Sequence, residues 1–298
     1  MTSFLDKVTA SGFNFCIFFM CYLFSAITYA GLSAEIDDTE QFDIQSHQVG
    51  DMFRIQIGLP GDYKKGKPYK LVYILDGNKY FGTAAALSRA MYESAAEPGF
   101  PQLIIVGVGY PDGNHRPVLR RRDFTTYEIK ANKYLSDAAE EIGYSGRLSG
   151  GAHNFFKFIE RELDPLIREK YQTGTERSGL IGHSLGGQFG LFAFLQESTI
   201  FDRYWWSSPA VGGDGGELVE KYSQFIQKSK FSGGRVFVTV GEEEIDGFGQ
   251  SYLNITAKLS AARPSGLVFG RKILASDSHV TAHYSGMARA FRFLFKED

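Results

Sequence analysis

Short runs of consecutive apolar residues alternate along this chain with segments whose apolar residues recur at helical spacing. A run without polar positions is typical of a parallel strand, because helices cover both faces of such a strand. Residues 71–75 and 103–108 are runs of this kind, and further strands are predicted at 180–181, 204–206, 235–240 and 267–274. Strands that alternate with helices predict an α/β fold, with a mainly parallel, doubly wound sheet and helices on both faces.

Residues 41–60 alternate between apolar and polar positions instead. Phe53, Ile55 and Ile57 fall on one face and Arg54 falls on the other. This period of two is typical of an antiparallel strand with one buried face. We therefore expect a half-buried antiparallel strand before the parallel ones.

Helical spacing predicts the elements between the strands. Helices are expected at 83–94, 155–167, 188–196, 252–262 and 284–295. Pro165 should kink or split the second of these, because proline lacks the N–H group that a helix interior uses. Residues 126–150 have weak periodicity and many polar positions, and we expect them to form an excursion over the sheet.

The first 30 residues form a separate segment. Lys7 precedes an apolar run at 13–30, which ends in Thr28, Tyr29 and Ala30. This order predicts a secretory signal peptide, and because the run is almost long enough to cross a bilayer, an uncleaved membrane anchor is the alternative. Residues 31–298 are then a single periplasmic or secreted domain, with membrane contact only through the N-terminal segment.

Composition narrows the possible functions. The chain has 298 residues, of which 43% are hydrophobic, and a formal net charge of −2. That length supports one large domain, and neither the charge nor any basic stripe favours nucleic acid. Both cysteines, Cys16 and Cys21, lie in the N-terminal segment. The domain therefore has no cysteine for a disulfide, a thiol nucleophile or a metal, and we expect no cofactor.

Residues 182–187 read GHSLGG and fit the G-x-S-x-G nucleophile elbow, in which a strand turns sharply into a helix. Such a turn projects the Ser184 hydroxyl toward a base, which a weak nucleophile needs. Gly182 and Gly186 keep side chains out of the crowded turn. The amide of Leu185, at the start of the following helix, is one predicted donor of an oxyanion hole.

The base and the acid are expected after later strands, because hydrolases of this architecture place nucleophile, acid and base in that order. His279 directly follows the last strand and is the predicted base. The alternative, His283, starts the final helix, where a surface or capping role suits it better. His183 adjoins the nucleophile and is predicted to be structural.

Four carboxylates follow the strand at 235–240, namely Glu242, Glu243, Glu244 and Asp246. One of them should hold the imidazole tautomer and stabilise the imidazolium, and we choose Glu244. The second oxyanion donor should follow the strand at 71–75, where Gly77 or Asn78 is available. We favour Gly77, because glycine lets the backbone approach a substrate closely.

With these residues in place, the chain resembles the esterase family of α/β hydrolases that includes esterase D-type enzymes. Within that family it is most similar to the periplasmic esterases that open trilactone siderophores. The resemblance runs from about residue 42 to 295 and rests on LVYILDGNKYF (71–81), IIVGVGYPD (104–112), RRDFT (121–125), LIGHSLGGQFGLFA (180–193), SSPAVGGD (207–214), VGEEE (240–244) and SDSH (276–279). It implies an α/β-hydrolase fold with Ser184 as nucleophile, His279 as base and Glu244 as acid, although some members of this branch work with a serine–histidine pair and no well-placed acid. The chain departs from the family after Pro209, where relatives often carry paired tryptophans.

The function expected from this reading is that of a serine carboxylic-ester hydrolase. It would act through an acyl-enzyme on siderophore lactones or other small esters. An acyltransferase on the same scaffold and a non-catalytic binding protein are the alternatives. A ferric catecholate siderophore is polyanionic and suits arginine. We therefore expect Arg120 and Arg121 to contact the substrate, and Arg122 or its neighbour to pair with Asp123.

Overall fold

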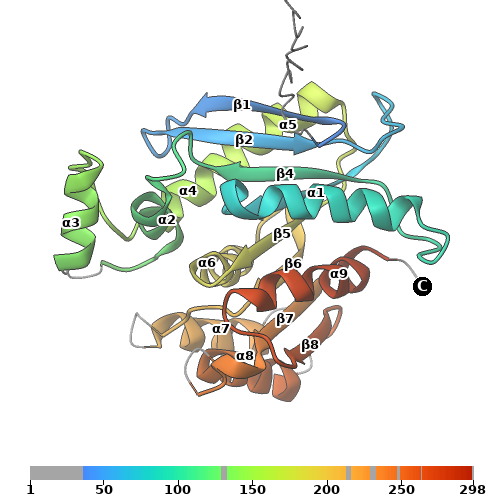
Figure 1. Cartoon of the computed structure of the whole chain (residues 1–298). Coiled ribbons are helices and arrows are strands. Elements are labelled where there is room, and N and C mark those ends of the chain that lie inside the picture. Colours follow the sequence, from blue (N-terminus) through green and yellow to red (C-terminus); the bar gives the residue numbers. More distant parts are fainter. Residues whose placement is uncertain are drawn as a thin grey trace, which may run out of the picture. The chain divides into compact units, whose positions relative to one another are not determined.

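The computed structural model describes residues 36–296, except 129–132, 213–215, 229–232, 247–248 and 263. The predicted signal or anchor segment, with both cysteines, lies outside the described residues. The described part contains an eight-stranded sheet in the order β1-β2-β4-β3-β5-β6-β7-β8 (Figure 1). Its strands are β1 (Thr39–Gln45), β2 (Met52–Gly58), β3 (Lys70–Leu75), β4 (Leu103–Gly109), β5 (Ser178–His183), β6 (Phe201–Ser207), β7 (Arg235–Gly241) and β8 (Val268–Leu274).

The alternating segment near the N-terminus forms an antiparallel hairpin. β1 pairs with β2, and β2 runs antiparallel to β4. The expected single antiparallel strand is therefore two strands, joined by a turn around Gly50. Phe53, Ile55 and Ile57 are fully buried, as predicted, whereas Arg54 reaches across the hairpin to Asp43 at 2.8 Å.

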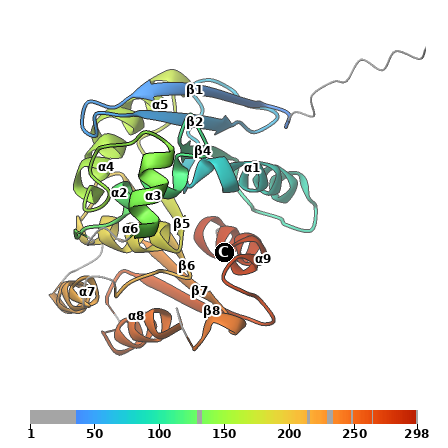
Figure 2. The same ribbon diagram turned by 60° about the vertical axis from the view of Figure 1, so that its left-hand side comes forward.

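All other neighbouring strands are parallel, and helices cover both faces of the sheet. Helices α1 and α9 pack on one face, and α4, α6, α7 and α8 lie on the other (Figure 2). The predicted doubly wound arrangement is thus confirmed. The helices are α1 (Gly77–Glu93), α2 (Arg116–Phe124), α3 (Lys133–Glu141), α4 (Ala152–Phe158), α5 (Asp164–Tyr171), α6 (Leu185–Leu195), α7 (Glu217–Lys228), α8 (Gly249–Ala262) and α9 (Thr281–Phe295).

Pro165 divides the helical stretch before β5, as expected. A π-helical turn, Ile159–Leu163, separates α4 from α5. The proline is the second residue of α5, directly after this turn, so the widened turn lies where proline cannot donate an intrahelical hydrogen bond. The predicted excursion at 126–150 contains one short helix, α3. Among the described residues, no helix combines the length and apolarity needed to span a membrane.

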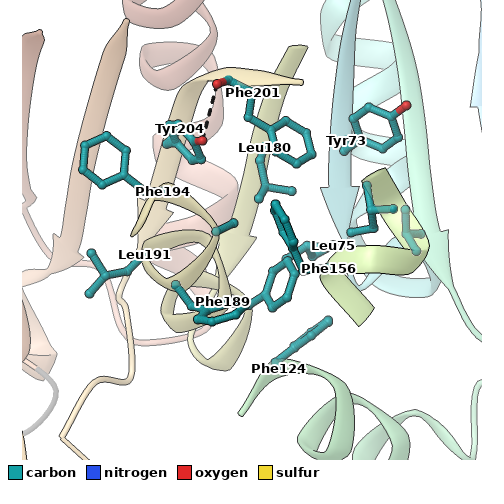
Figure 3. Close-up of a cluster of buried hydrophobic side chains, with 14 of the residues drawn as sticks. Tyr73, Leu75, Phe124, Phe156, Leu180, Phe189, Leu191, Phe194, Phe201 and Tyr204 are labelled. Carbon is teal, nitrogen blue, oxygen red and sulfur yellow. Dashed lines mark hydrogen bonds between the residues drawn. The ribbon is translucent and has the colours of Figure 1, made fainter. Parts of the chain in front are cut away.

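The apolar strands contribute to two cores at once, because successive side chains of a strand point to opposite faces. Tyr73 and Leu75 of β3 pack with Leu180 and with Phe189 of α6 in the core under that helix (Figure 3). Val72 and Ile74 point into the other core, which α1 and α9 cover. Burial on both faces fixes the strands, and the polar residues that carry the candidate chemistry follow at their carboxyl ends.

Candidate active site

The chain turns sharply at Ser184, between β5 and α6. Its φ of 59° and ψ of −116° lie in a region that L-residues rarely adopt. Two hydrogen bonds hold the turn: the Ser184 amide donates to the Ser207 carbonyl at 2.9 Å, and the Ala210 amide donates to the Ser184 carbonyl at 3.0 Å. A Cβ at Gly182 would collide with the Gly186 carbonyl. The strand–turn–helix geometry expected of an elbow is therefore present.

His279 and Glu244 meet at the ends of two neighbouring strands. His279 follows β8, and Glu244 closes a 3₁₀ turn, Glu242–Glu244, directly after β7. The Nδ1 atom of His279 lies 2.5 Å from Oε2 of Glu244. The other carboxylate oxygen accepts hydrogen bonds from the Ser208 hydroxyl at 2.5 Å and from the Gly241 amide at 2.6 Å. Both oxygens of Glu244 are thus fixed by protein groups.

The charge of Glu244 follows from these contacts. Burial by itself raises the pKa of its carboxyl group, but hydrogen bonds from His279, Ser208 and Gly241 outweigh burial and hold the pKa below 4.5. The carboxylate is therefore ionised at neutral pH and can only accept, so Nδ1 of His279 carries a proton. In a neutral imidazole this leaves the lone pair on Nε2, the arrangement that a general base needs.

The other three carboxylates of this loop have different surroundings. Oε2 of Glu242 accepts the Ser276 amide at 2.9 Å, and both Glu243 and Asp246 are exposed. Of the four alternatives, the structure brings Glu244 to His279.

The neighbouring histidines are buried in the core beside the site. His283 is completely buried, and its ring stacks on Trp205 with centroids 4.5 Å apart and an interplanar angle of 5°. The expected surface or capping role of His283 is therefore wrong, because the first turn of α9 faces the sheet. Burial holds the pKa of His283 well below its usual range. His183, predicted to be structural, is buried as well.

The two predicted oxyanion donors lie at helix starts, where first-turn amides have no intrahelical acceptor. Leu185 begins α6 and Gly77 begins α1. A Cβ at Gly77 would lie 2.9 Å from the backbone of Gly107 and Val108. The glycine is thus required for packing α1 against β4, which corrects the expected reason for it. Asn78 uses its side chain to clamp both backbone polar groups of Tyr110, at 2.7 and 2.8 Å.

Asp76, just before Gly77, has a buried carboxylate and a left-handed backbone, with φ of 54° and ψ of 44°. Arg120 binds both of its oxygens, at 2.7 and 2.8 Å, and Arg116 adds a third contact at 3.1 Å. Burial raises the pKa of Asp76, but the two guanidinium groups lower it by more. Arg120 also reaches the His183 carbonyl at 3.4 Å. Arg120 therefore connects the turn at Asp76 with the turn at His183. The expectation that it contacts substrate is revised, because its guanidinium donors are already bound to a buried carboxylate.

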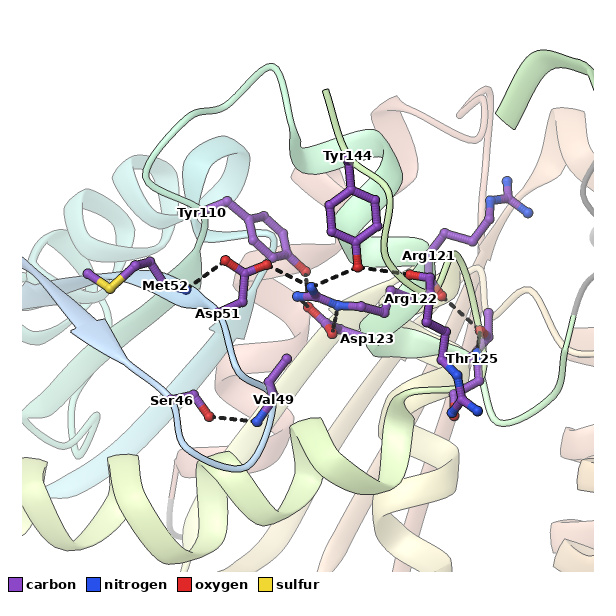
Figure 4. A network of polar contacts seen from close by, with 12 residues as sticks. Ser46, Val49, Asp51, Met52, Tyr110, Arg121, Arg122, Asp123, Thr125 and Tyr144 are labelled. Carbon is purple, nitrogen blue, oxygen red and sulfur yellow. Dashed lines mark hydrogen bonds and ion pairs between the residues drawn. The ribbon is translucent and has the colours of Figure 1, made fainter. Parts of the chain in front are cut away.

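Arg121 and Arg122 point to different surroundings. The Nε atom of Arg121 is buried without a hydrogen-bond partner among the described residues. Arg122 binds both oxygens of Asp123, at 2.7 and 2.9 Å, so the predicted pairing is confirmed. Arg122 also reaches Asp51 in the β1–β2 turn at 2.7 Å, and Tyr110 donates to Asp123 at 3.0 Å (Figure 4). This network ties α2 to the sheet edge and fixes the helix that carries Arg120.

Sequence reasoning missed three residues that support the site. Ser208 holds Glu244, Asp76 anchors the start of α1, and Tyr80 hydrogen-bonds to His183. Ser208 and Asp76 each directly follow a buried strand, which is the position where an open α/β sheet places its site. Nothing in the sequence marked Tyr80 as a site residue, because core packing explains an aromatic residue on the apolar face of a helix. No group of three or more potential metal ligands occurs within the described ranges.

Comparison with known proteins identifies the relatives of this chain. The family model described as "Putative esterase" matches residues 46–263. Ferri-bacillibactin esterase BesA of Bacillus subtilis is 27% identical over 268 residues, which cover 88% of this chain and 91% of that protein. The siderophore triacetylfusarinine C esterase of Aspergillus fumigatus is 31% identical over 204 residues, 66% of this chain and 64% of that protein. The crystal structure of the BES protein from Bacillus cereus superposes with a TM-score of 0.77 at 28% identity, covering 89% of this chain and 98% of the other.

Proposed function

This chain belongs to the esterase family whose model it matches, and we propose that it hydrolyses esters through an acyl-enzyme formed on Ser184. Family membership establishes the α/β-hydrolase fold and an ester-hydrolysing enzyme close to the siderophore esterases. The acyl-enzyme proposal rests on one observation: a strained serine elbow after β5 shares its sheet edge with the Glu244–His279 pair after β7 and β8.

In the first half-reaction, Oγ of Ser184 attacks the ester carbonyl carbon while Nε2 of His279 takes its proton. The tetrahedral oxyanion accepts hydrogen bonds from the amides of Leu185 and Gly77. When the intermediate collapses, the bond to the leaving oxygen breaks, and His279 returns the proton to the departing alcohol. The acyl group is then bonded to Ser184.

Water completes the reaction by the same proton path. His279 takes a proton from the water molecule as its oxygen attacks the acyl carbon, and the same proton then returns to Ser184 as the acid leaves. Glu244 stabilises the imidazolium in both halves, because its carboxylate lies 2.5 Å from Nδ1.

The proposed substrate is a siderophore lactone, and its support is the named activity of the relatives. Positive charge on α2 also supports an anionic substrate. Arg116, Arg120 and Arg121 line one cavity of about 150 Å³. Asp76 offsets only part of their positive charge. Arg121 is therefore the guanidinium that we assign to an anionic substrate.

The decisive experiment compares the wild type with Ser184→Ala on ferric and iron-free trilactone siderophores and on p-nitrophenyl esters. Nearly all turnover should disappear in the variant without a change in melting temperature, because the half-exposed hydroxyl supplies chemistry rather than core packing. A fluorophosphonate probe should label the wild type alone. Substantial turnover by the variant would contradict the acyl-enzyme. Acylated products formed in the presence of an added alcohol would indicate transferase activity.

The substrate role of Arg121 has its own test. Arg121→Gln should raise KM for an anionic siderophore and leave a neutral ester unchanged. The difference should shrink as salt is added, because the Debye length is only about 8 Å at physiological ionic strength. Arg289→Gln is the matched control, since Arg289 lies exposed on α9. Equal effects on charged and neutral substrates would show that Arg121 is part of the scaffold.

A further inference from the structure

We propose that His183 is a positioning residue, which ties the loop carrying His279 directly to the nucleophile turn. Nε2 of His183 lies 2.7 Å from the backbone carbonyl oxygen of His279, and its Nδ1 lies 3.1 Å from the Tyr80 hydroxyl. The inference rests on the proposed function, since it concerns how the base of that same site is held.

The hydrogen-bond partners determine the tautomer of His183. A carbonyl oxygen can only accept, so Nε2 must carry the proton that bonds to His279. In a neutral imidazole Nδ1 is then an acceptor, and the Tyr80 hydroxyl donates to it. Tyr80 is almost fully buried on α1, which packs against the same face of the sheet as α9. The His279 carbonyl thus selects the tautomer, and the Tyr80 hydroxyl supplies the donor that Nδ1 of this tautomer needs.

The surroundings keep His183 neutral. The residue is 5% exposed, and burial lowers its pKa to about 3; the proximity of His279 and Arg120 also lowers the pKa, whereas the hydrogen bond to the His279 carbonyl and the charge of Asp76 oppose this. The remaining titratable groups against it are Tyr80 and His283, whose rings lie 5.8 and 5.3 Å away. No change of charge at His183 is thus expected over the pH range in which esterases work.

The contact matters because His279 reaches the site from a distant strand. Its carboxylate partner belongs to the turn after β7 and is linked to the nucleophile turn through Ser208, whose neighbours Ser207 and Ala210 hydrogen-bond to Ser184. The His183 contact is a more direct link, since His183 directly precedes Ser184 and its ring lies 4.5 Å from the ring of His279. Any shift of the nucleophile turn therefore moves the backbone anchor of the base as well.

The test removes the two ring nitrogens of His183 while keeping the volume of an aromatic ring. His183→Phe keeps an aromatic ring but removes both hydrogen bonds, and kcat on p-nitrophenyl acetate should fall by about 10- to 100-fold with KM nearly unchanged, because displacement of a base by about 1 Å costs this much. His183→Gln keeps an N–H donor at a similar reach, so it should recover most of the lost kcat. A role limited to stability would change the melting temperature and would not be rescued in kcat by glutamine.

His283→Phe is the matched control, because it makes the same change in the same aromatic cluster. Neither ring nitrogen of His283 has a hydrogen-bond partner among the described residues, so kcat should stay within about twofold of the wild type. If His183→Phe fails to fold, Tyr80→Phe tests the same inference by deleting only the hydroxyl that donates to Nδ1 of His183. We expect it to lower kcat several-fold at constant KM.

The outcomes separate this inference from the proposed function. If the wild type hydrolyses esters and labels at Ser184, but folded His183→Phe matches His283→Phe or Tyr80→Phe matches the wild type, the positioning role is wrong. The positioning role is also wrong if glutamine at position 183 restores kcat no better than phenylalanine does. If the wild type hydrolyses no ester at all, the proposed function itself fails.

Discussion

Replacing Glu244 by glutamine tests how the site stabilises charge. The amide is nearly isosteric, and its oxygen can still accept from Ser208 and Gly241. Its NH₂ group then faces Nδ1 of His279 across the 2.5 Å contact. Nδ1 of His279 must now accept a hydrogen bond, which moves the imidazole proton to Nε2. That Nε2 atom is the one that has to receive the proton of Ser184. The substitution therefore removes a negative charge and selects the wrong tautomer.

The magnitude follows from the geometry. Two unit charges about 4 Å apart interact by about 4 kcal/mol at an effective dielectric constant of about 20. The His279 side chain is 27% exposed and that of Glu244 is 5% exposed, so we discount this to about 2 kcal/mol for screening. The lost hydrogen bond to a charged group adds roughly 1.5 kcal/mol. The sum of about 3 to 4 kcal/mol corresponds to a loss of about 10²- to 10³-fold in kcat/KM.

The assay is hydrolysis of p-nitrophenyl butyrate between pH 6 and 9, with Glu243→Gln as the control. Glu243 belongs to the same turn but is exposed, so its amide should leave kcat/KM within about twofold. His279→Ala should lose more than Glu244→Gln, because it removes the base itself. A loss of less than about fivefold in Glu244→Gln would refute the reasoning, since the serine–histidine pair would then work without its carboxylate.

Three further predictions concern stability. Arg120→Ala should lower the free energy of unfolding by about 3 kcal/mol, measured by urea denaturation, because it leaves the Asp76 carboxylate buried with Arg116 alone; an unchanged midpoint would contradict a bracing role. Gly182→Ala should cost about 1 to 3 kcal/mol in the same assay and abolish turnover, because its Cβ overlaps the elbow. For His183, the unfolded chain takes up a proton below about pH 6.5, whereas the native pKa is about 3. The contribution of His183 to stability should thus be constant above pH 6.5 and fall by about 1.4 kcal/mol per pH unit between pH 6.5 and about 3; His183→Gln should show a slope shallower by this amount.

Local patterns were sufficient to predict the parallel strands and the nucleophile turn. Apolar runs such as 71–75 are buried on both faces in the structure, because burial and sequence periodicity report the same physical constraint. The GHSLGG segment forms the expected turn, since only a residue without a Cβ fits at Gly182. The order of nucleophile, acid and base pointed to the loops after β7 and β8, where the structure brings Glu244 and His279 together.

Long-range contacts were beyond sequence reasoning. Arg120 looked available for an anionic ligand, but Asp76, 44 residues earlier, already occupies its donors. His283 looked exposed at a helix start, whereas the first turn of α9 lies against Trp205 of β6. In each case the partner comes from a distant strand end or strand. Such pairings depend on strand order, which periodicity does not encode.

The separation of β5 and β8 in the sheet constrains how this protein can diverge. Neighbouring strands lie about 4.8 Å apart, so three strand spacings place these two about 14 Å apart. The loop that follows β8 must cross the ends of β7 and β6 before its histidine reaches the nucleophile turn, and Leu274 and Ala282, which bound it, are both buried. Insertions or deletions here would change the reach of the base. Helix α3, between α2 and α4, carries neither Glu244 nor His279, so a change in its length leaves the reach of the base the same.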